Sequence, residues 1–339
     1  MTPKVLFRRS LFALVPLVAV LVIGEVGARL FWQRPDMDTR DGMGLAPHPT
    51  RIWTLDASEQ EAQFAHRFRL DPNGLRMART TGAQHRILTV GDSSIFGHGL
   101  GDEETLHAGI HEAFKQHGHR VDGLTIAMPG YTTEQSLRVL EEHGWGLEPD
   151  LLLLGGLWSD NDIEPISDRE WLAQLQSPRQ LIEWALRDSR LFEWVRFTLE
   201  PPPETSTPVT WGLDPLGSGN RRVSPTAYEE NLQSMLLQAQ SRQASAVVLV
   251  PCNRPLLSQE TPETGWPWDA YVTAMEKLAA DHNLPIVYGC EVAKAAHIDI
   301  QKGFLDEMHP TGALNRAYAD AIAAALIERN WPTEPLAPR

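Results

Sequence analysis

The stretch Arg86-Ile87-Leu88-Thr89-Val90-Gly91-Asp92-Ser93-Ser94 decides the fold of this chain of 339 residues. It begins as a short apolar run of the kind that forms a buried strand, and it stops at Gly91 before a segment of helical character. A serine at such a turn lies at the mouth of an α/β sheet. Because a serine hydroxyl is a poor nucleophile until a base takes its proton, Ser93 needs suitable partners elsewhere in the chain.

Strands and helices alternate from this stretch onward. We expect strands at 87–90, 121–127, 151–157, 246–250 and 285–288, and helices at 103–117, 133–143, 228–240, 268–282 and 313–329. The unbroken apolar run of the third strand is typical of a strand that is buried on both faces. The alternation predicts a three-layer αβα sandwich with a central, parallel, five-stranded sheet.

An insertion interrupts this alternation between the third strand and the fourth. About 90 residues lie there, far more than one crossover helix needs. Apolar residues at near-helical spacing predict two helices that end before Pro201-Pro202-Pro203: Trp171, Leu175, Leu181, Trp184, Leu191, Trp194 and Val195. The insertion, placed at about 163–225, is either a pair of packed helices with buried tryptophans or a lid beside the active site, because insertions near strand ends line the crevice.

Four further residues follow the predicted strands in an order that suits a serine nucleophile. Gly130 follows the second strand, where its backbone N–H and that of Ser93 could bind an oxyanion. Asn161 follows the third strand and offers an amide donor to the same oxyanion. Asp306 and His309 precede the last helix, spaced so that the carboxylate reaches Nδ1 while Nε2 faces Ser93. Each residue alone is common in turns and caps; their conjunction predicts a catalytic site.

With these motifs the chain resembles the SGNH or GDSL family of serine hydrolases. The four blocks of that family correspond to Gly91-Asp92-Ser93-Ser94, Gly130, Asn161 and Asp306-x-x-His309, and the resemblance covers roughly residues 66–329. It implies the flavodoxin-like fold of these hydrolases for a domain at 66–330, followed by a tail at 331–339.

The upstream segment Asn73-Gly74-Leu75-Arg76 is similar to one found in bacterial, membrane-anchored members of the family. Its Asn-Gly pair predicts a turn between short extended pieces. The chain departs from the family at Ser94, where many members have Phe or Leu, and at Ser159, which replaces a common glycine. Neither departure removes a catalytic group, so both bear on the substrate and leave the expected mechanism intact.

The resemblance implies a mechanism in which His309 takes the proton of Ser93 and Asp306 orients His309. The N–H groups of Ser93 and Gly130 and the amide of Asn161 would hold the oxyanion. We expect a carboxyl-ester hydrolase acting on acyl or acetyl groups carried by a glycan or a lipid. The same residues would serve a polysaccharide O-acyltransferase, and a catalytically silent glycan-binding module with stacking tryptophans is the third hypothesis.

The N-terminus carries an export signal. Lys4, Arg8 and Arg9 precede the apolar run 11–24, which is the most continuous in the chain. A segment of this kind places the basic end inside the cytoplasm and the body of the protein outside it. We expect a polar stalk or N-terminal cap at 33–65.

Two outcomes are open for this segment, at residues 1–32. Extended to Trp32 it forms a hydrophobic helix of about 20 residues that could stay as a single-pass anchor in a bacterial inner membrane, with the catalytic domain in the periplasm. Glu25 and Arg29 then lie one helical turn apart and could pair. Cleavage near Val26-Gly27-Ala28 would instead release a secreted protein.

Composition excludes other classes of function. The net charge of −14 argues against nucleic acid as a partner, because there is no surplus of basic residues to neutralise phosphates. Apart from Asp306-x-x-His309, no cluster with metal-ligand spacing is visible, and no phosphate-binding glycine motif, so we expect neither metal nor cofactor. Cys252 and Cys290 each follow a predicted strand, and they either form a disulfide or remain two buried thiols.

Overall fold

The structure is a computed structural model that describes residues 3–33, 45–55, 68–78, 80–200, 220–258 and 265–336. It divides into two compact units, Met1–Asp41 with Gln174–Val209, and Gly42–Ala173 with Thr210–Arg339. Parts of the predicted stalk, the Pro201-Pro202-Pro203 stop and the last three residues of the predicted tail lie outside the described residues. The bounds predicted for the stalk, the hydrolase domain and the insertion stay predictions.

The larger unit is built on a parallel five-stranded sheet of order β4-β3-β5-β8-β9. Its strands are β3 (His85–Val90), β4 (Val121–Thr125), β5 (Leu151–Gly155), β8 (Ser245–Val250) and β9 (Ile286–Tyr288). Numbered along the chain this order is 2-1-3-4-5, that of flavodoxin-like folds. Every residue of β5 is buried, as its apolar run predicts. The predicted three-layer fold and its central sheet are confirmed.

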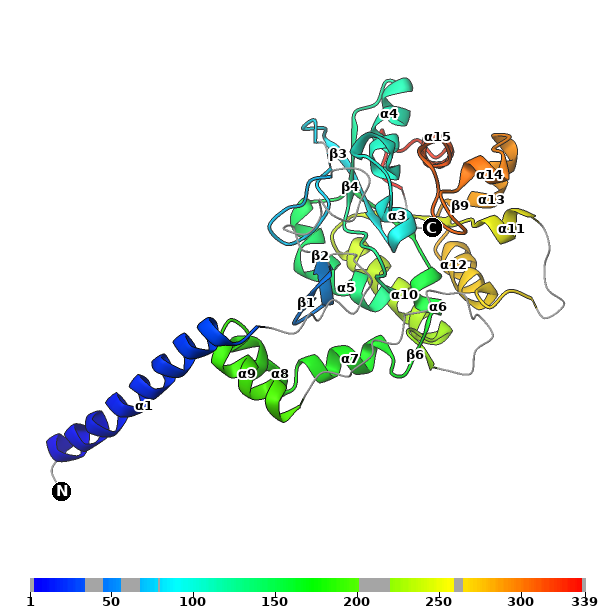
Figure 1. Cartoon of the computed structure of the whole chain (residues 1–339). Helices are drawn as coiled ribbons and strands as arrows, with labels where there is room; N and C mark the ends of the chain where they lie inside the picture. The colour runs from blue at the N-terminus through cyan, green and yellow to red at the C-terminus, as the bar shows by residue number, and fades with distance from the viewer. Residues whose placement is uncertain are drawn as a thin grey trace. The chain divides into compact units, whose positions relative to one another are not determined.

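Helices cover both faces of this sheet (Figure 1). On one face α4 (Leu106–Gln116) packs against α15 (Gly312–Ile327), and on the other α10 (Pro225–Ser241) packs between α5 (Thr133–Glu142) and α12 (Asp269–Asp281). Short elements complete the layers: α3 (Ser93–Phe96), η1 (Asp102–Glu104), η2 (Gly144–Leu147), α6 (Trp158–Asn161), α11 (Arg254–Ser258), α13 (Gly289–Ala295) and α14 (Ile300–Gly303). Polar caps fix where several helices begin, since Thr105 caps α4 and Ser224 caps α10 just before Pro225.

Two short antiparallel pairs flank the sheet in the same unit. The hairpin of β1 (Leu45–His48) and β2 (Ile52–Leu55) lies in the region predicted as a stalk or cap. In the insertion, β6 (Ile163–Glu164) pairs with β7 (Asn220–Arg221). The Asn73-Gly74 turn is present as predicted, with Gly74 at φ +77° and a bridge between Leu70 and Arg76.

The insertion holds three helices in its described part, where the sequence predicted two: α7 (Asp168–Leu175), α8 (Pro178–Ala185) and α9 (Arg190–Leu199). Ser177 and Ser189 cap the second and third, and these polar caps make one more break than the apolar spacing indicates. One of the two alternatives for the insertion had buried tryptophans, and Trp194 does not fit it, because its side chain is 46% exposed. Phe197, one helical turn further along α9, is buried instead.

The smaller unit joins α8 and α9 to the N-terminal helix α1 (Pro3–Phe31). Glu25 of α1 accepts hydrogen bonds from Ser189 Oγ, Arg190 N and Leu191 N at 2.8, 3.1 and 3.0 Å, so it caps the first turn of α9. The predicted pair of Glu25 with Arg29 is confirmed, at 2.7 Å.

Of the helices in the described part of the chain, none combines the length and the apolar character that crossing a membrane requires.

Cys252 and Cys290 form a disulfide with their Cα atoms 4.9 Å apart. They follow β8 and β9, which are paired neighbours in the sheet. The sequence left open whether these cysteines form a disulfide or remain two buried thiols, and the structure contains the disulfide.

Candidate active site

Ser93 lies where β3 passes into α3, at the carboxyl end of the sheet. It is the first residue of α3, so its N–H is among those that the helix itself leaves without a partner. Asp92 precedes it as the N-cap, and Gly97 ends the helix at φ +81°. The side chain is half-buried. The predicted strand-to-helix turn thus presents the serine at the sheet edge.

Gly91 allows this turn to pack closely on the neighbouring strand. A Cβ at Gly91 would come within 1.9 Å of the Gly155 carbonyl oxygen at the end of β5. Gly156 adopts φ +110°, a conformation that favours glycine. Close approach of the two strand ends therefore explains the glycine in front of Asp92-Ser93.

Asp92 connects two loops of the site by hydrogen bonds to both of them. It is 1% exposed and accepts hydrogen bonds from Ser94 N and Ser94 Oγ at 2.9 and 2.6 Å. Its second oxygen accepts from Trp158 N, at 3.1 Å, at the start of the helix that contains Asn161. The sequence did not indicate this role, which depends on a contact between residues 66 positions apart.

Asp306, His309 and Ser93 form a continuous hydrogen-bonded chain. His309 Nε2 lies 2.8 Å from Ser93 Oγ, and His309 Nδ1 lies 2.6 Å from Asp306 Oδ2. Asp306 Oδ1 also accepts the N–H groups of Met308 and His309, each at 2.9 Å. With the Nδ1 proton donated to Asp306, Nε2 is free to accept the hydroxyl proton of Ser93.

Asp306 is held in its ionised form. Partial burial raises its pKa, but the hydrogen bond and charge of His309 and the backbone N–H groups of Met308 and His309 outweigh that effect and hold the pKa well below its usual range. A carboxylate at this place orients the imidazole and stabilises its cationic form.

His98 stacks on His309 and was given no role by the sequence. The ring centroids lie 4.6 Å apart and the ring planes are tilted by 34°. Burial, followed by the charge of His309, lowers the pKa of His98 to about 4, although Asp306 opposes this. His98 is therefore uncharged at neutral pH, and its ring packs against the imidazole of His309.

Gly130 and Asn161, the other predicted residues, lie on the two loops next to Ser93. Gly130 follows β4 and is buried at φ +72°, and Asn161 is the last residue of α6 and is 3% exposed. Asp160 joins these loops, because it accepts Thr133 N and Thr133 Oγ1 at 2.9 and 2.5 Å.

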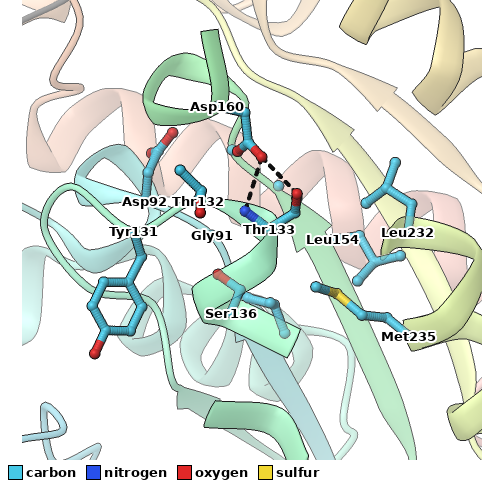
Figure 2. Close-up of a pocket in the computed structure, with 13 residues that line it drawn as sticks. Gly91, Asp92, Tyr131, Thr132, Thr133, Ser136, Leu154, Asp160, Leu232 and Met235 are labelled. Atoms are coloured by element: carbon cyan, nitrogen blue, oxygen red, sulfur yellow. Dashed lines mark hydrogen bonds between the residues drawn. The ribbon is translucent and has the colours of Figure 1, made fainter. Parts of the chain in front are cut away.

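Figure 2 shows this junction between the loops. Asp160 meets Thr133 at one side of a small pocket, and Leu232 and Met235 of α10 form its apolar side. Burial raises the pKa of Asp160 well above its ordinary value, although the bonds from Thr133 oppose this shift. The loops of Ser93, Gly130 and Asn161 are therefore connected by two buried aspartates, Asp92 and Asp160.

In the described residues no group of three or more His, Cys, Asp or Glu side chains is placed to hold a metal ion.

Comparison with known proteins gives matches among solved structures. No family model matches the chain, and no curated protein matches it. A lipase/acylhydrolase from Enterococcus faecalis is 17% identical, with a TM-score of 0.46 over 73% of this chain and 97% of that one. A putative lipolytic protein of the G-D-S-L family from Desulfitobacterium hafniense is 11% identical, with a TM-score of 0.43 over 72% and 100%. Axe2, an acetylxylan esterase from Geobacillus stearothermophilus, is 16% identical, with a TM-score of 0.46 over 73% and 96%.

Proposed function

We propose that this chain is a serine esterase of the SGNH or GDSL type, which hydrolyses carboxylic esters of acyl or acetyl groups through an acyl-serine intermediate. The observation that carries the proposal is the chain from Ser93 Oγ to His309 Nε2, at 2.8 Å, and from His309 Nδ1 to Asp306 Oδ2, at 2.6 Å. It brings together residues 216 positions apart, in the geometry that serine nucleophiles need.

In the proposed reaction His309 takes the hydroxyl proton as Ser93 attacks the ester carbonyl carbon. Asp306 stays ionised and stabilises the imidazolium, which then gives its proton to the departing alcohol. Water, deprotonated by His309, attacks the acyl carbon, and His309 returns that proton to Ser93 Oγ as its bond to the acyl group breaks and the acid leaves. The N–H groups of Ser93 and Gly130 and the Asn161 amide bind the oxyanion, each worth about 10²–10³ in rate.

The proposal includes a place outside the cytoplasm and an ester carried by a glycan or a lipid. The basic and apolar N-terminus supports this location. The Cys252–Cys290 disulfide supports it independently, since disulfides persist in oxidising compartments. Cell fractionation tests the location and the anchor. Full-length chain in the cytosolic fraction would contradict both the location outside the cytoplasm and the N-terminal membrane anchor. A shortened chain in the medium would contradict the anchor alone.

Hydrolysis of p-nitrophenyl acetate by the full chain tests the activity. We expect turnover that is lost in Ser93→Ala and in His309→Ala. Ser241→Ala is the matched control, because Ser241 is a serine at the far end of α10 whose hydroxyl donates to Gln238 O. Equal turnover by Ser93→Ala and wild type would refute the proposal. Transfer of acetyl to an added oligosaccharide in preference to water would point to the acyltransferase alternative.

A further inference from the structure

The two carbonyl groups that flank Gly130 are both held by distant side chains. Pro129 O accepts a hydrogen bond from Trp53 Nε1 at 3.2 Å, and Gly130 O accepts one from Arg222 Nη1 at 2.7 Å. Both side chains are buried, with Trp53 3% and Arg222 2% exposed. Trp53 belongs to β2, and Arg222 directly follows β7 in the insertion.

The bond to Pro129 O fixes the direction of the Gly130 N–H. These two groups belong to the same peptide plane and point in opposite directions, because the peptide bond is planar and trans. Gly130 does not hold this plane by itself, since glycine passes readily between backbone conformations. In the described part of the chain the Gly130 N–H makes no hydrogen bond of its own, so it is available to a ligand.

Trp53 and Arg222 are themselves held by neighbouring groups, Trp53 through its backbone carbonyl and its ring and Arg222 through its guanidinium. Tyr131 Oη donates to Trp53 O at 2.6 Å, and the Arg222 guanidinium lies over the Trp53 ring at 5.0 Å. Arg222 also binds both oxygens of Asp168, at 3.1 and 2.7 Å, and Gln135 Oε1, at 2.8 Å. A bidentate ion pair of this kind keeps the guanidinium in one orientation.

We propose that Trp53 and Arg222 are positioning residues for the oxyanion hole. Together they hold the peptide on either side of Gly130 so that its N–H stays directed at the developing oxyanion. The β1–β2 hairpin, predicted as part of a stalk or cap, thereby belongs to the support of the active site. The inference rests on the proposed function, because this N–H matters to catalysis only if Ser93 attacks a carbonyl group.

Trp53→Phe tests the inference by removing the indole N–H while keeping an aromatic ring. We expect kcat for p-nitrophenyl acetate to fall by about tenfold, less than loss of a whole oxyanion donor costs. KM should stay within about twofold and the pH profile unchanged, since the ground-state ester and His309 are untouched. The matched control is Trp145→Phe, which removes an indole N–H that donates to Gln238 Oε1 at 2.9 Å in another part of the unit. Its kcat should equal that of the wild type.

Amide hydrogen exchange gives a readout that does not require turnover. The Tyr131 N–H donates to Met128 O across this loop, at 3.1 Å. In Trp53→Phe its exchange should become at least about tenfold faster, and in Trp145→Phe it should not change. Arg222→Lys keeps a charge for Asp168 but loses the planar fork, and it should shift kcat and exchange in the same direction.

The outcomes separate the two proposals. A wild type without esterase activity would refute the proposed function, and exchange at Tyr131 would still decide whether Trp53 holds the loop. Unchanged exchange in Trp53→Phe, with or without a fall in kcat, would overturn the inference. Faster exchange together with wild-type kcat, in an active enzyme, would also overturn it.

Discussion

Arg76 holds the loop that follows α3, and we predict that Arg76→Met destabilises the protein strongly. Its side chain is fully buried, with 0% exposed. It donates to the carbonyl oxygens of Phe96, Gly97 and Leu100 at 3.1, 3.0 and 2.9 Å and to the Asp102 carboxylate at 3.1 Å. This contact explains the arginine of the Asn-Gly-Leu-Arg segment, whose turn delivers it beneath the loop that carries His98.

The magnitude follows from the partners that Arg76 would leave behind. Each buried acceptor that loses its donor costs about 1–3 kcal/mol, and breaking a buried ion pair costs about 3–5 kcal/mol. Because the Asp102 side chain is 31% exposed, water can hydrogen-bond to its carboxylate and reduce the cost of breaking this ion pair. Methionine keeps most of the packing between the Phe68 and Phe96 rings, whose centroids lie 4.8 and 5.1 Å from the guanidinium carbon. With the three carbonyl groups at the lower end of their range, about 1 kcal/mol each, and about 1 kcal/mol for the partly solvated Asp102, we expect the free energy of unfolding to fall by about 4 kcal/mol.

Arg69 provides the matched control, since it approaches the same carboxylate. Its Nε lies 3.8 Å from Asp102 Oδ2, but its side chain is 63% exposed. An exposed pair contributes less than about 1 kcal/mol, so Arg69→Met should scarcely change stability. Urea unfolding of wild type and both variants at pH 7 measures the difference. If Arg76→Met and Arg69→Met lowered the free energy of unfolding equally, the reasoning would be refuted. The free energy of unfolding of Arg76→Lys should lie between those of wild type and Arg76→Met.

Three further predictions concern the site and the stability of the fold. Asp306→Asn should lower kcat by about 10⁴ because His309 loses its orienting carboxylate, and a loss below tenfold in ester hydrolysis would contradict that role. Burial, with a smaller effect of a nearby arginine charge, lowers the pKa of His107 to about 3 from its ordinary 6.5. As pH falls below 6.5 the unfolded chain takes up a proton that the native state refuses, so stability drops by about 1.4 kcal/mol per pH unit. His107→Gln should therefore lose less stability than wild type between pH 7.5 and pH 5 in urea unfolding, and an identical loss in both would exclude this effect. The Cys252–Cys290 disulfide closes a loop of 38 residues, so replacing both cysteines with serine should lower the free energy of unfolding by about 4 kcal/mol, whereas an unchanged urea midpoint would show that the loop contributes nothing.

The predicted site residues could be found because each has a local signature. Ser93, Gly130 and Asn161 follow successive strands, and Asp306 and His309 share a short motif before the last helix. In a parallel sheet the carboxyl ends of the strands meet at one edge, so position along the chain already implies proximity in space. Hydrophobic periodicity likewise located every strand of the central sheet, with ends that differ by at most a few residues from those of the structure.

The residues that the sequence did not reveal have no such signature. Trp53 and Arg222 contact the Gly130 loop although they lie 76 and 92 positions from their partners in the sequence. His98 is likewise far from His309 in the sequence, yet their rings are in contact. No periodicity or motif marks a tryptophan or arginine as the partner of a particular carbonyl group. The insertion was predicted to hold two helices and holds three in its described part, because its capping serines add a break that the apolar spacing does not show.

The sequence by itself determined the candidate residues and their order, since Gly91-Asp92-Ser93 and Asp306-x-x-His309 place the proposed nucleophile, base and carboxylate on a predictable sheet edge. Only the tertiary structure decided how that edge is made rigid, through Asp92 and through the side chains that hold the loops. The reason is physical. Strand and helix formation depends on patterns among neighbouring residues, whereas a buried hydrogen bond between remote residues exists only once the whole chain has packed.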